Sequence, residues 1–299
     1  MAVSSTQTRT RSNARAGRSP KTPATPAASA RRTRPGRVSP APLRPVPIAG
    51  SKPKPSASAA EVVQAYLKVQ VAKLRSLEPE VRADEFDSVH QMRVVTRRLR
   101  ATLRSFGKVI PRPATEKVAG ELKWLGGLLG EARDGEVLPQ HLLASLETVP
   151  VEQLIGPVQA RVQGHFAPLR ASAREQVIEA FGSVRYAKLL ANLDQLAHDP
   201  PRGPQAGAPA RDVLPAAVHK AYRQAKRRMR RARQAPRGQA RDVALHEARK
   251  SARRARYAAE VARPASGRAA RTFASSVRMV SSASRVSYRP AVCPWTKAA

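Results

Sequence analysis

The chain lacks the residues that hold small disulfide-rich or aromatic-rich domains together. Cys293 is the only cysteine among 299 residues, which excludes an intramolecular disulfide and a zinc site built from several cysteines. Aromatic residues make up 4% of the chain, so a core must consist of Leu, Val and Ala, which suits packing between helices. No apolar run approaches the ~18 residues that span a membrane, and no apolar stretch follows the first basic residues as in a secretory signal. We therefore expect an all-α, cytoplasmic protein without a membrane span.

Acidic residues are also scarce. The 21 Asp and Glu face 55 Lys and Arg, which gives a formal net charge of +34 and points to anionic partners: nucleic acid, anionic membranes or polyphosphate. Residues 1–57 contain twelve of these cations, many Pro, Ser and Thr, and no acid, so we predict a disordered basic tail. Without the twelve cations the rest of the chain still carries +22, so the folded part is basic in its own right.

Helical periodicity dominates from Ser58 onward, and the alternation typical of strands is absent. We predict a first helical half over 58–198, a Pro- and Gly-rich linker over 199–210, a second helical half over 211–280 and an irregular tail over 281–299. The predicted helices cover 59–77, 88–110, 115–130 with Gly130 as the terminating glycine, a segment starting at Asp134, and 151–179, 184–197, 212–234 and 242–262.

One helical face carries a row of basic residues that occurs twice. Residues at spacings of 3, 4, 3 and 4 share a narrow face of a helix. The first row comprises His90, Arg93, Arg97, Arg100 and Arg104. The second follows 156 residues later, as the difference between 246 and 90, and comprises His246, Arg249, Arg253, Arg256 and Glu260. Arg98 and Arg254 match at the same shift, so we infer an internal duplication with a pseudo-twofold arrangement of its halves.

Like charges at these spacings cost about 0.2–0.5 kcal/mol per pair in an isolated helix. A solvated face on an arginine-rich protein would explain one such row, but the repetition with identical spacing, led each time by His, favours a binding role. A bound polyanion compensates the repulsion, because guanidinium groups grip phosphate oxygens in pairs and stay charged at physiological pH.

Three segments resemble the CHAD domain, the conserved histidine α-helical domain. They are VHQMRVVTRRLR at 89–100, ELKWLGGLLGEARD at 121–134 and LHEARKSARRARY at 245–257. The resemblance covers about residues 58–280. It implies two four-helix bundles related by a pseudo-twofold, with a basic central channel that binds inorganic polyphosphate.

By position, the resemblance assigns binding roles to residues of both halves. In the first half these are His90, Arg93, Arg97, Arg98, Arg100, Arg104, Lys123 and Arg133. In the second half they are Lys220, Arg223, Arg227, Arg230, His246, Arg249, Lys250, Arg253, Arg254 and Arg256. The resemblance allows targeting to polyphosphate granules, and the sequence leaves the oligomeric state open.

The second half departs from the family pattern. Ala255 and Ala259 stand where bulkier apolar residues are usual, which predicts looser packing. A second Leu-Gly motif is expected after about residue 278, but the chain reads Ser-Ser-Ala-Ser there. A Leu-Gly codon pair read out of frame gives Ser-Ala, so we hypothesise a frameshift near Val280, a sequencing error, or a truncated second bundle.

Other functions find less support in the sequence. A nonspecific nucleic-acid binder is the alternative, but no aromatic platform or helix-turn-helix pattern is evident. The segment 78–82 resembles a triphosphate-hydrolase motif but contains Pro79, and no carboxylate cluster or phosphate-binding loop supports a phosphatase or kinase. A metal held between His90 and His246 would be repelled by the flanking arginines. We expect a non-enzymatic protein without a cofactor, in which bound phosphate favours protonation of both histidines.

Overall fold

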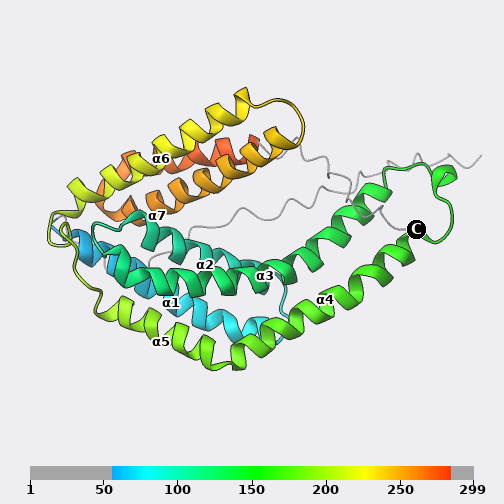
Figure 1. Cartoon of the computed structure of the whole chain (residues 1–299), viewed down its shortest axis with the longest axis horizontal. Helices are drawn as coiled ribbons and strands as arrows, with labels where there is room; N and C mark the ends of the chain where they lie inside the picture. Colours follow the sequence, from blue (N-terminus) through cyan, green and yellow to red (C-terminus); the bar gives the residue numbers. More distant parts are fainter. Residues whose placement is uncertain (1–55, 284–299) are drawn as a thin grey trace, which may run out of the picture. The chain divides into compact units, whose positions relative to one another are not determined.

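The computed structural model describes residues 56–283, and their side chains as far as Ser266. This part of the chain forms seven α-helices and one 3-10 turn and contains no strand, which confirms the all-α prediction (Figure 1). The helices are α1 (Ala59–Arg82), α2 (Ser88–Ser105), α3 (Arg112–Leu146), α4 (Val158–Gly182), α5 (Val184–His198), α6 (Ala210–Gln234) and α7 (Gln239–Ala283). The predicted tail over 1–57 lies outside the described residues except for its last two, as does the predicted tail from residue 284 onward.

A capping box starts α1. The Glu61 backbone N–H donates to Ser58 Oγ at 3.3 Å, and the Ser58 backbone N–H donates to Glu61 Oε2 at 2.7 Å. These two bonds satisfy donors that a helix N-terminus otherwise leaves free. The helix continues to Arg82, beyond the predicted end at 77, although Pro79 lies within it. In this last turn Arg82 pairs with Glu78 at 2.9 Å.

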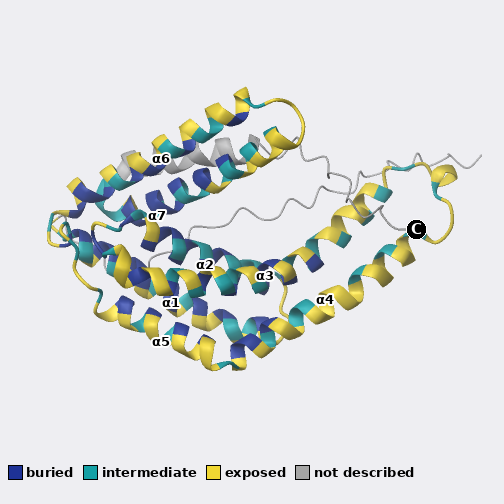
Figure 2. Ribbon diagram, viewed as in Figure 1, coloured by how far each residue is buried: buried dark blue, intermediate teal, exposed yellow. Residues whose placement is uncertain are grey.

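The main core is built around α1 and α2. Met92, Leu99 and Leu103 on one side of α2 are buried, and α2 contacts α1, α3, α6 and α7. One continuous apolar cluster joins residues from every helix, although α7 contributes only its segment 258–262 (Figure 2). Burying a Leu side chain stabilises a fold by roughly 1.5–3 kcal/mol, so this cluster fixes the orientation of α2 and of the row on its other face.

The third helix corrects a prediction. We expected Gly130 to end one helix and Asp134 to begin another, but α3 runs without a break from Arg112 to Leu146. The sequence signal was wrong because packing of α3 against α2 outweighs the weak helix preference of Gly130. The guanidinium of Arg93 lies against α3 here, 3.4 Å from the position that a Cβ of Gly130 would take.

The C-terminal part of α3 and the N-terminal part of α4 lie side by side and extend past the other helices of this region (Figure 1). Their residues are mostly exposed (Figure 2). The helix predicted over 151–179 starts only at Val158, because a 3-10 turn (Val151–Gln153) and Gly156, with a φ of 76°, precede it.

The predicted linker is fixed to the helices around it. The Gly203 backbone N–H donates to the Val109 carbonyl at 2.8 Å, and the Ala59 N–H donates to the Ala208 carbonyl at 2.9 Å. A Cβ at Gly203 would lie 2.5 Å from the Lys108 carbonyl oxygen, so only glycine fits this approach. The segment 199–209 therefore sets where α6 begins.

The second half consists of α6 and α7. They pack side by side through a small cluster of alanines, and α7 also contacts α2 (Figure 1). The cluster comprises Ala221, Ala225, Ala252 and Ala255. Gly238, with a φ of 103°, supports the turn between the two helices. The last helix was predicted over 242–262 but runs from Gln239 to Ala283, with Pro264 inside it. The hypothesised frameshift near Val280 concerns positions whose side chains lie outside the described part.

Candidate anion-binding site

Two helices bring the repeated basic rows together, and we call the nine residues concerned the α2–α7 basic surface. On each helix the row points away from the apolar stripe, because each residue turns the helix by about 100°. Most of these side chains are half-buried, whereas Arg104 and His246 are exposed. The surface comprises His90, Arg93, Arg97, Arg100 and Arg104 from α2, and His246, Arg249, Arg253 and Arg256 from α7.

The electrostatics show that the rows approach each other. Burial, Arg93 and Arg253 together lower the pKa of Arg97 to about 10. The pKa of Arg253 is lowered as well, by burial first and then by Arg256, Arg249 and Arg93. Arg93 and Arg97 come from α2 and Arg253 comes from α7, so cations of the two helices lie within reach of each other's field. All of them remain charged at neutral pH.

The two histidines lie at the same surface. Burial lowers the pKa of His90, and the charges of Arg133, Arg97 and Arg93 lower it further, although Asp87 opposes them. Burial also lowers the pKa of His246, with Lys250, Arg253 and Arg249 acting in the same direction and Glu247 against it. Both rings are therefore mainly neutral at pH 7 in the free protein, and an anion placed between the arginines would favour their protonated form.

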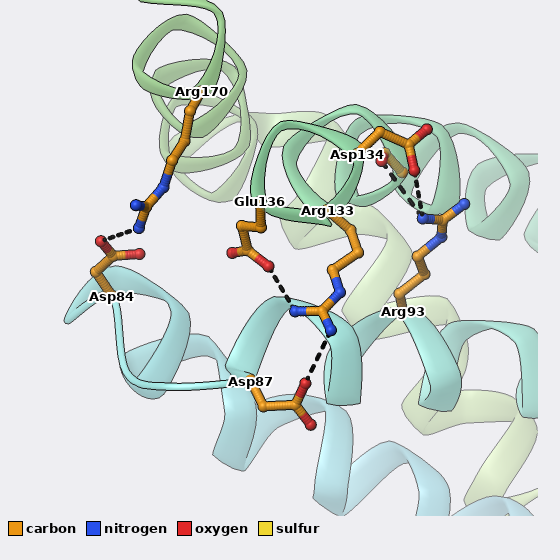
Figure 3. Close-up of polar contacts among 8 residues, drawn as sticks. Asp84, Asp87, Arg93, Arg133, Asp134, Glu136 and Arg170 are labelled. Atoms are coloured by element: carbon orange, nitrogen blue, oxygen red, sulfur yellow. Dashed lines mark hydrogen bonds and ion pairs between the residues drawn. The ribbon is translucent and has the colours of Figure 1, made fainter. Parts of the chain in front are cut away.

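Carboxylates of neighbouring segments hold Arg93 of the first row and Arg133 beside it (Figure 3). Arg133 pairs with Glu136 at 2.7 Å and with Asp87 at 3.3 Å. Arg93 Nη1 lies 3.5 Å from Asp134 and 3.4 Å from the Gly130 carbonyl oxygen. These contacts orient the end of the surface nearest His90 and neutralise much of its charge.

Arg98 was predicted to bind the anion, but the structure places it in the protein interior. Its residue is 4% exposed, and its Nε–H donates to Glu260 Oε2 at 2.9 Å. The Tyr66 hydroxyl donates to the same carboxylate oxygen at 3.5 Å. Burial acts to lower the pKa of Arg98, but Glu260 and Tyr66 outweigh it, so the pKa is raised. Arg98 thus joins α1, α2 and α7, and we leave it out of the α2–α7 basic surface.

Sequence reasoning missed Tyr257. This residue is 3% exposed and makes a side-chain hydrogen bond with Arg97. The guanidinium carbon of Arg256 lies 4.9 Å from the centre of its ring. An aromatic residue directly after the second row was the available signal, because a ring there can support flanking guanidinium groups.

The predicted basic row on α6 is not brought to this surface. Its four residues are exposed and lie opposite Ala221 and Ala225, which face α7. They are Lys220, Arg223, Arg227 and Arg230. Arg228 lies on the inner side of α6 instead, and its charge reaches Arg254.

Two further predicted residues are exposed. Lys123 lies on α3, which packs against α2, and Lys250 pairs with Glu247 at 2.8 Å. Neither forms a hydrogen bond or ion pair with a residue of the α2–α7 basic surface among the described contacts, although the charge of Lys250 acts on His246.

A cavity of about 330 Å³ lies elsewhere, between α3 and α5. Asp199 is the charged residue that lines it, and no cation does, so it is unsuited to a polyanion. Within residues 56–266, no cluster of three or more His, Cys, Asp or Glu side chains is arranged to hold a metal ion. None of the described helices combines the length and the apolar character needed to cross a membrane.

The sequence matches the CHAD domain family over residues 65–283. Two proteins of Mycobacterium tuberculosis are 34% identical over 215 residues: "Uncharacterized protein MT2285" of strain CDC 1551 / Oshkosh and "Uncharacterized protein Rv2226" of strain ATCC 25618 / H37Rv. The match covers 70% of this chain and 41% of each relative, so the chain spans about two fifths of the length of these curated relatives.

Two solved structures share the fold. The chain resembles PptA from Streptomyces chartreusis with a TM-score of 0.59 and 18% identity, over 80% of this chain and 89% of that one. It resembles the CHAD domain from the plant Ricinus communis with a TM-score of 0.56 and 23% identity, over 77% and 74% of the two chains. With the family match over most of its described length, the chain belongs to the CHAD domain family.

Proposed function

We propose that this chain binds inorganic polyphosphate through the α2–α7 basic surface. The observation that carries the proposal is that α2 and α7 hold together five arginines of this surface that form no ion pair within the described part of the chain. Within the described part of the chain, no ion pair involves Arg97, Arg100 or Arg253, and none involves Arg104 or Arg249. The Nε–H of Arg249 also has no acceptor among the described residues. Phosphate oxygens supply acceptors and charge for such groups.

A phosphate polymer suits the surface better than a nucleic acid does. Recognition of single-stranded nucleic acid relies on aromatic rings that stack on bases. The ring of Tyr257 is buried, and Phe86, which is 96% exposed, lies in the turn between α1 and α2. The surface therefore offers many arginine contacts to phosphates, and its exposed ring is the imidazole of His246.

We also propose that binding leaves the polymer intact. Phosphoryl transfer or hydrolysis with metal ions needs carboxylate ligands beside the substrate. The α2–α7 basic surface consists of arginines and two histidines, and the nearby Asp134 and Glu260 are engaged with Arg93 and Arg98. Incubating the protein with polyphosphate and magnesium and measuring released orthophosphate tests this: we expect no release above the protein-free control. Recruitment to polyphosphate granules in the cytoplasm is the cellular role that this binding would serve.

A competition experiment separates the proposed ligand from DNA. Labelled polyphosphate is bound to the full chain at about 150 mM salt and displaced with DNA or with unlabelled polyphosphate at equal total charge. We expect polyphosphate to displace the label at least about tenfold more effectively per charge. Equal displacement would reduce the assignment to general polyanion binding. Repeating the titration with a chain that starts at residue 56 measures the contribution of the twelve N-terminal cations.

A further inference from the structure

The contacts between α2 and α7 contain two positions related by the internal repeat. A shift of 156 residues converts Arg98 into Arg254, and it converts Arg104 into Glu260. The pair Arg98 and Glu260 therefore corresponds to the pair Arg254 and Arg104. Arg98 binds Glu260 at 2.9 Å, whereas Arg104 lies near enough to Arg254 for its charge to lower the pKa of Arg254.

The first pair, Arg98 and Glu260, is not accessible to solutes. The side chain of Arg98 is 5% exposed and that of Glu260 is 22% exposed, and each neutralises the other. Arg256 Nε lies 3.7 Å from Glu260 Oε1, and the Tyr66 hydroxyl donates to its other oxygen. The charge of this carboxylate is thus balanced within the protein.

The second pair, Arg254 and Arg104, is open to solvent and lies in a region of excess positive charge. Arg254 is half-buried, and its Nη1 donates to the neutral amide oxygen of Gln224 at 3.2 Å. Burial lowers the pKa of Arg254, and Arg104, Arg228 and Arg100 lower it further. Arg104 is exposed, so the cluster can be reached from solvent.

Glu247 is the carboxylate that acts on Arg254, and it is already shared. It lies 3.1 Å from Arg228 and 2.8 Å from Lys250. One negative charge therefore faces Lys250 and the four arginines of the cluster, which come from α2, α6 and α7: Arg100, Arg104, Arg228 and Arg254.

We propose that this four-arginine cluster is a discrete oligophosphate site, which holds the end of a polyphosphate chain. The inference rests on the proposed function and adds where an end of the polymer is held. An end phosphate carries more charge than an internal one, and converging guanidinium groups on three helices suit a compact, highly charged group. The related position at Arg98 and Glu260 offers no such site, so the two halves of the surface bind unequally and one end of the polymer is held at the four-arginine cluster.

The substitution Arg104→Glu tests the site, because it reproduces the pair that Arg98 makes with Glu260. The new carboxylate would pair with Arg254, so the protein is expected to fold and to keep its thermal stability. The matched control is Arg223→Glu, which makes the same charge change on the outer face of α6.

The probe is sodium tripolyphosphate, titrated calorimetrically into the full chain at about 150 mM salt. We expect one site per protein, an affinity about thirtyfold weaker in Arg104→Glu, and a change below about threefold in Arg223→Glu. Equal losses in the two variants, or an unchanged affinity in Arg104→Glu, would overturn the proposal. If Arg104→Glu does not fold, the same tripolyphosphate titration of Arg228→Gln, with Arg223→Glu as the control, tests the site.

Long-chain polyphosphate is titrated in parallel to separate two failures. If the unmodified chain does not bind the long polymer, the proposed function fails. If it binds the long polymer and Arg104→Glu retains tripolyphosphate, the function stands and only the end site is refuted.

Discussion

The two halves of the repeat carry the same basic row on different cores. In the first half, α2 packs through Met92, Leu99 and Leu103 into the large apolar cluster. In the second half, the residue that matches Leu99 is Ala255, which packs against the alanines of α6. Leucine separates helices and alanine brings them close, so the halves reach similar row geometry by different packing. The position of a basic row depends on the orientation of its helix, and both leucine-rich and alanine-rich packing can fix that orientation.

Exchanging the matched core residues, Leu99 and Ala255, tests this comparison and is expected to change the free energy of unfolding the most. Leu99→Ala leaves a cavity at a fully buried position and should lower the free energy of unfolding by about 3–4 kcal/mol. Ala255→Leu forces extra atoms between α6 and α7 and should lower it by about 1–3 kcal/mol. Chemical denaturation of both variants measures the difference. A tolerated Ala255→Leu would show that the second half has room for the bulkier residue expected from the family.

Removing one partner of the buried ion pair has the next largest effect. Glu260→Gln leaves Arg98 buried without a counter-charge, so we expect a loss of about 3 kcal/mol in the free energy of unfolding. Glu247→Gln is the control, because its pairs with Arg228 and Lys250 are largely exposed and should contribute less than about 1 kcal/mol. Similar losses in the two variants would mean that Arg98 does not clamp the two halves together.

Much of the fold and of the rows follows from spacing along the chain. Periodicity predicted the helices, and the steps of 3 and 4 placed both rows on helix faces that the structure brings together. Spacing placed Arg97 in the row and left Arg98 out of it. The family resemblance added Arg98 as a binding residue, and only tertiary packing shows that it points inward. Spacing likewise could not show that the α6 row faces away from α7 while Arg228 faces inward. The end predicted at Gly130 was wrong for a related reason, because a glycine inside a helix and a glycine that ends one look alike in sequence.

The pH dependence of polyphosphate binding compares the two rows through their histidines, and the expected change in affinity is smaller. Both histidines have lowered pKa values in the free protein, so bound polyphosphate should raise them and binding should take up protons. Affinity must then rise as pH falls, by about three- to tenfold between pH 8 and pH 6. Fluorescence titration across this range measures it. The double substitution His90→Gln with His246→Gln should flatten the profile, and an unchanged slope would place the titrating groups elsewhere.

The central claim is that one polymer contacts both rows at once, and calorimetric titration of polyphosphate of uniform length into the full chain tests it most directly. Arg93→Ala and Arg249→Ala remove one arginine from each row, and Arg18→Ala with Arg31→Ala is the control outside the surface. We expect each single row variant to weaken the same site by about tenfold and the pair to weaken it by about a hundredfold, with unchanged stoichiometry and little effect of the control. Two independent sites, each lost with one variant while the other keeps its affinity, would contradict a shared surface.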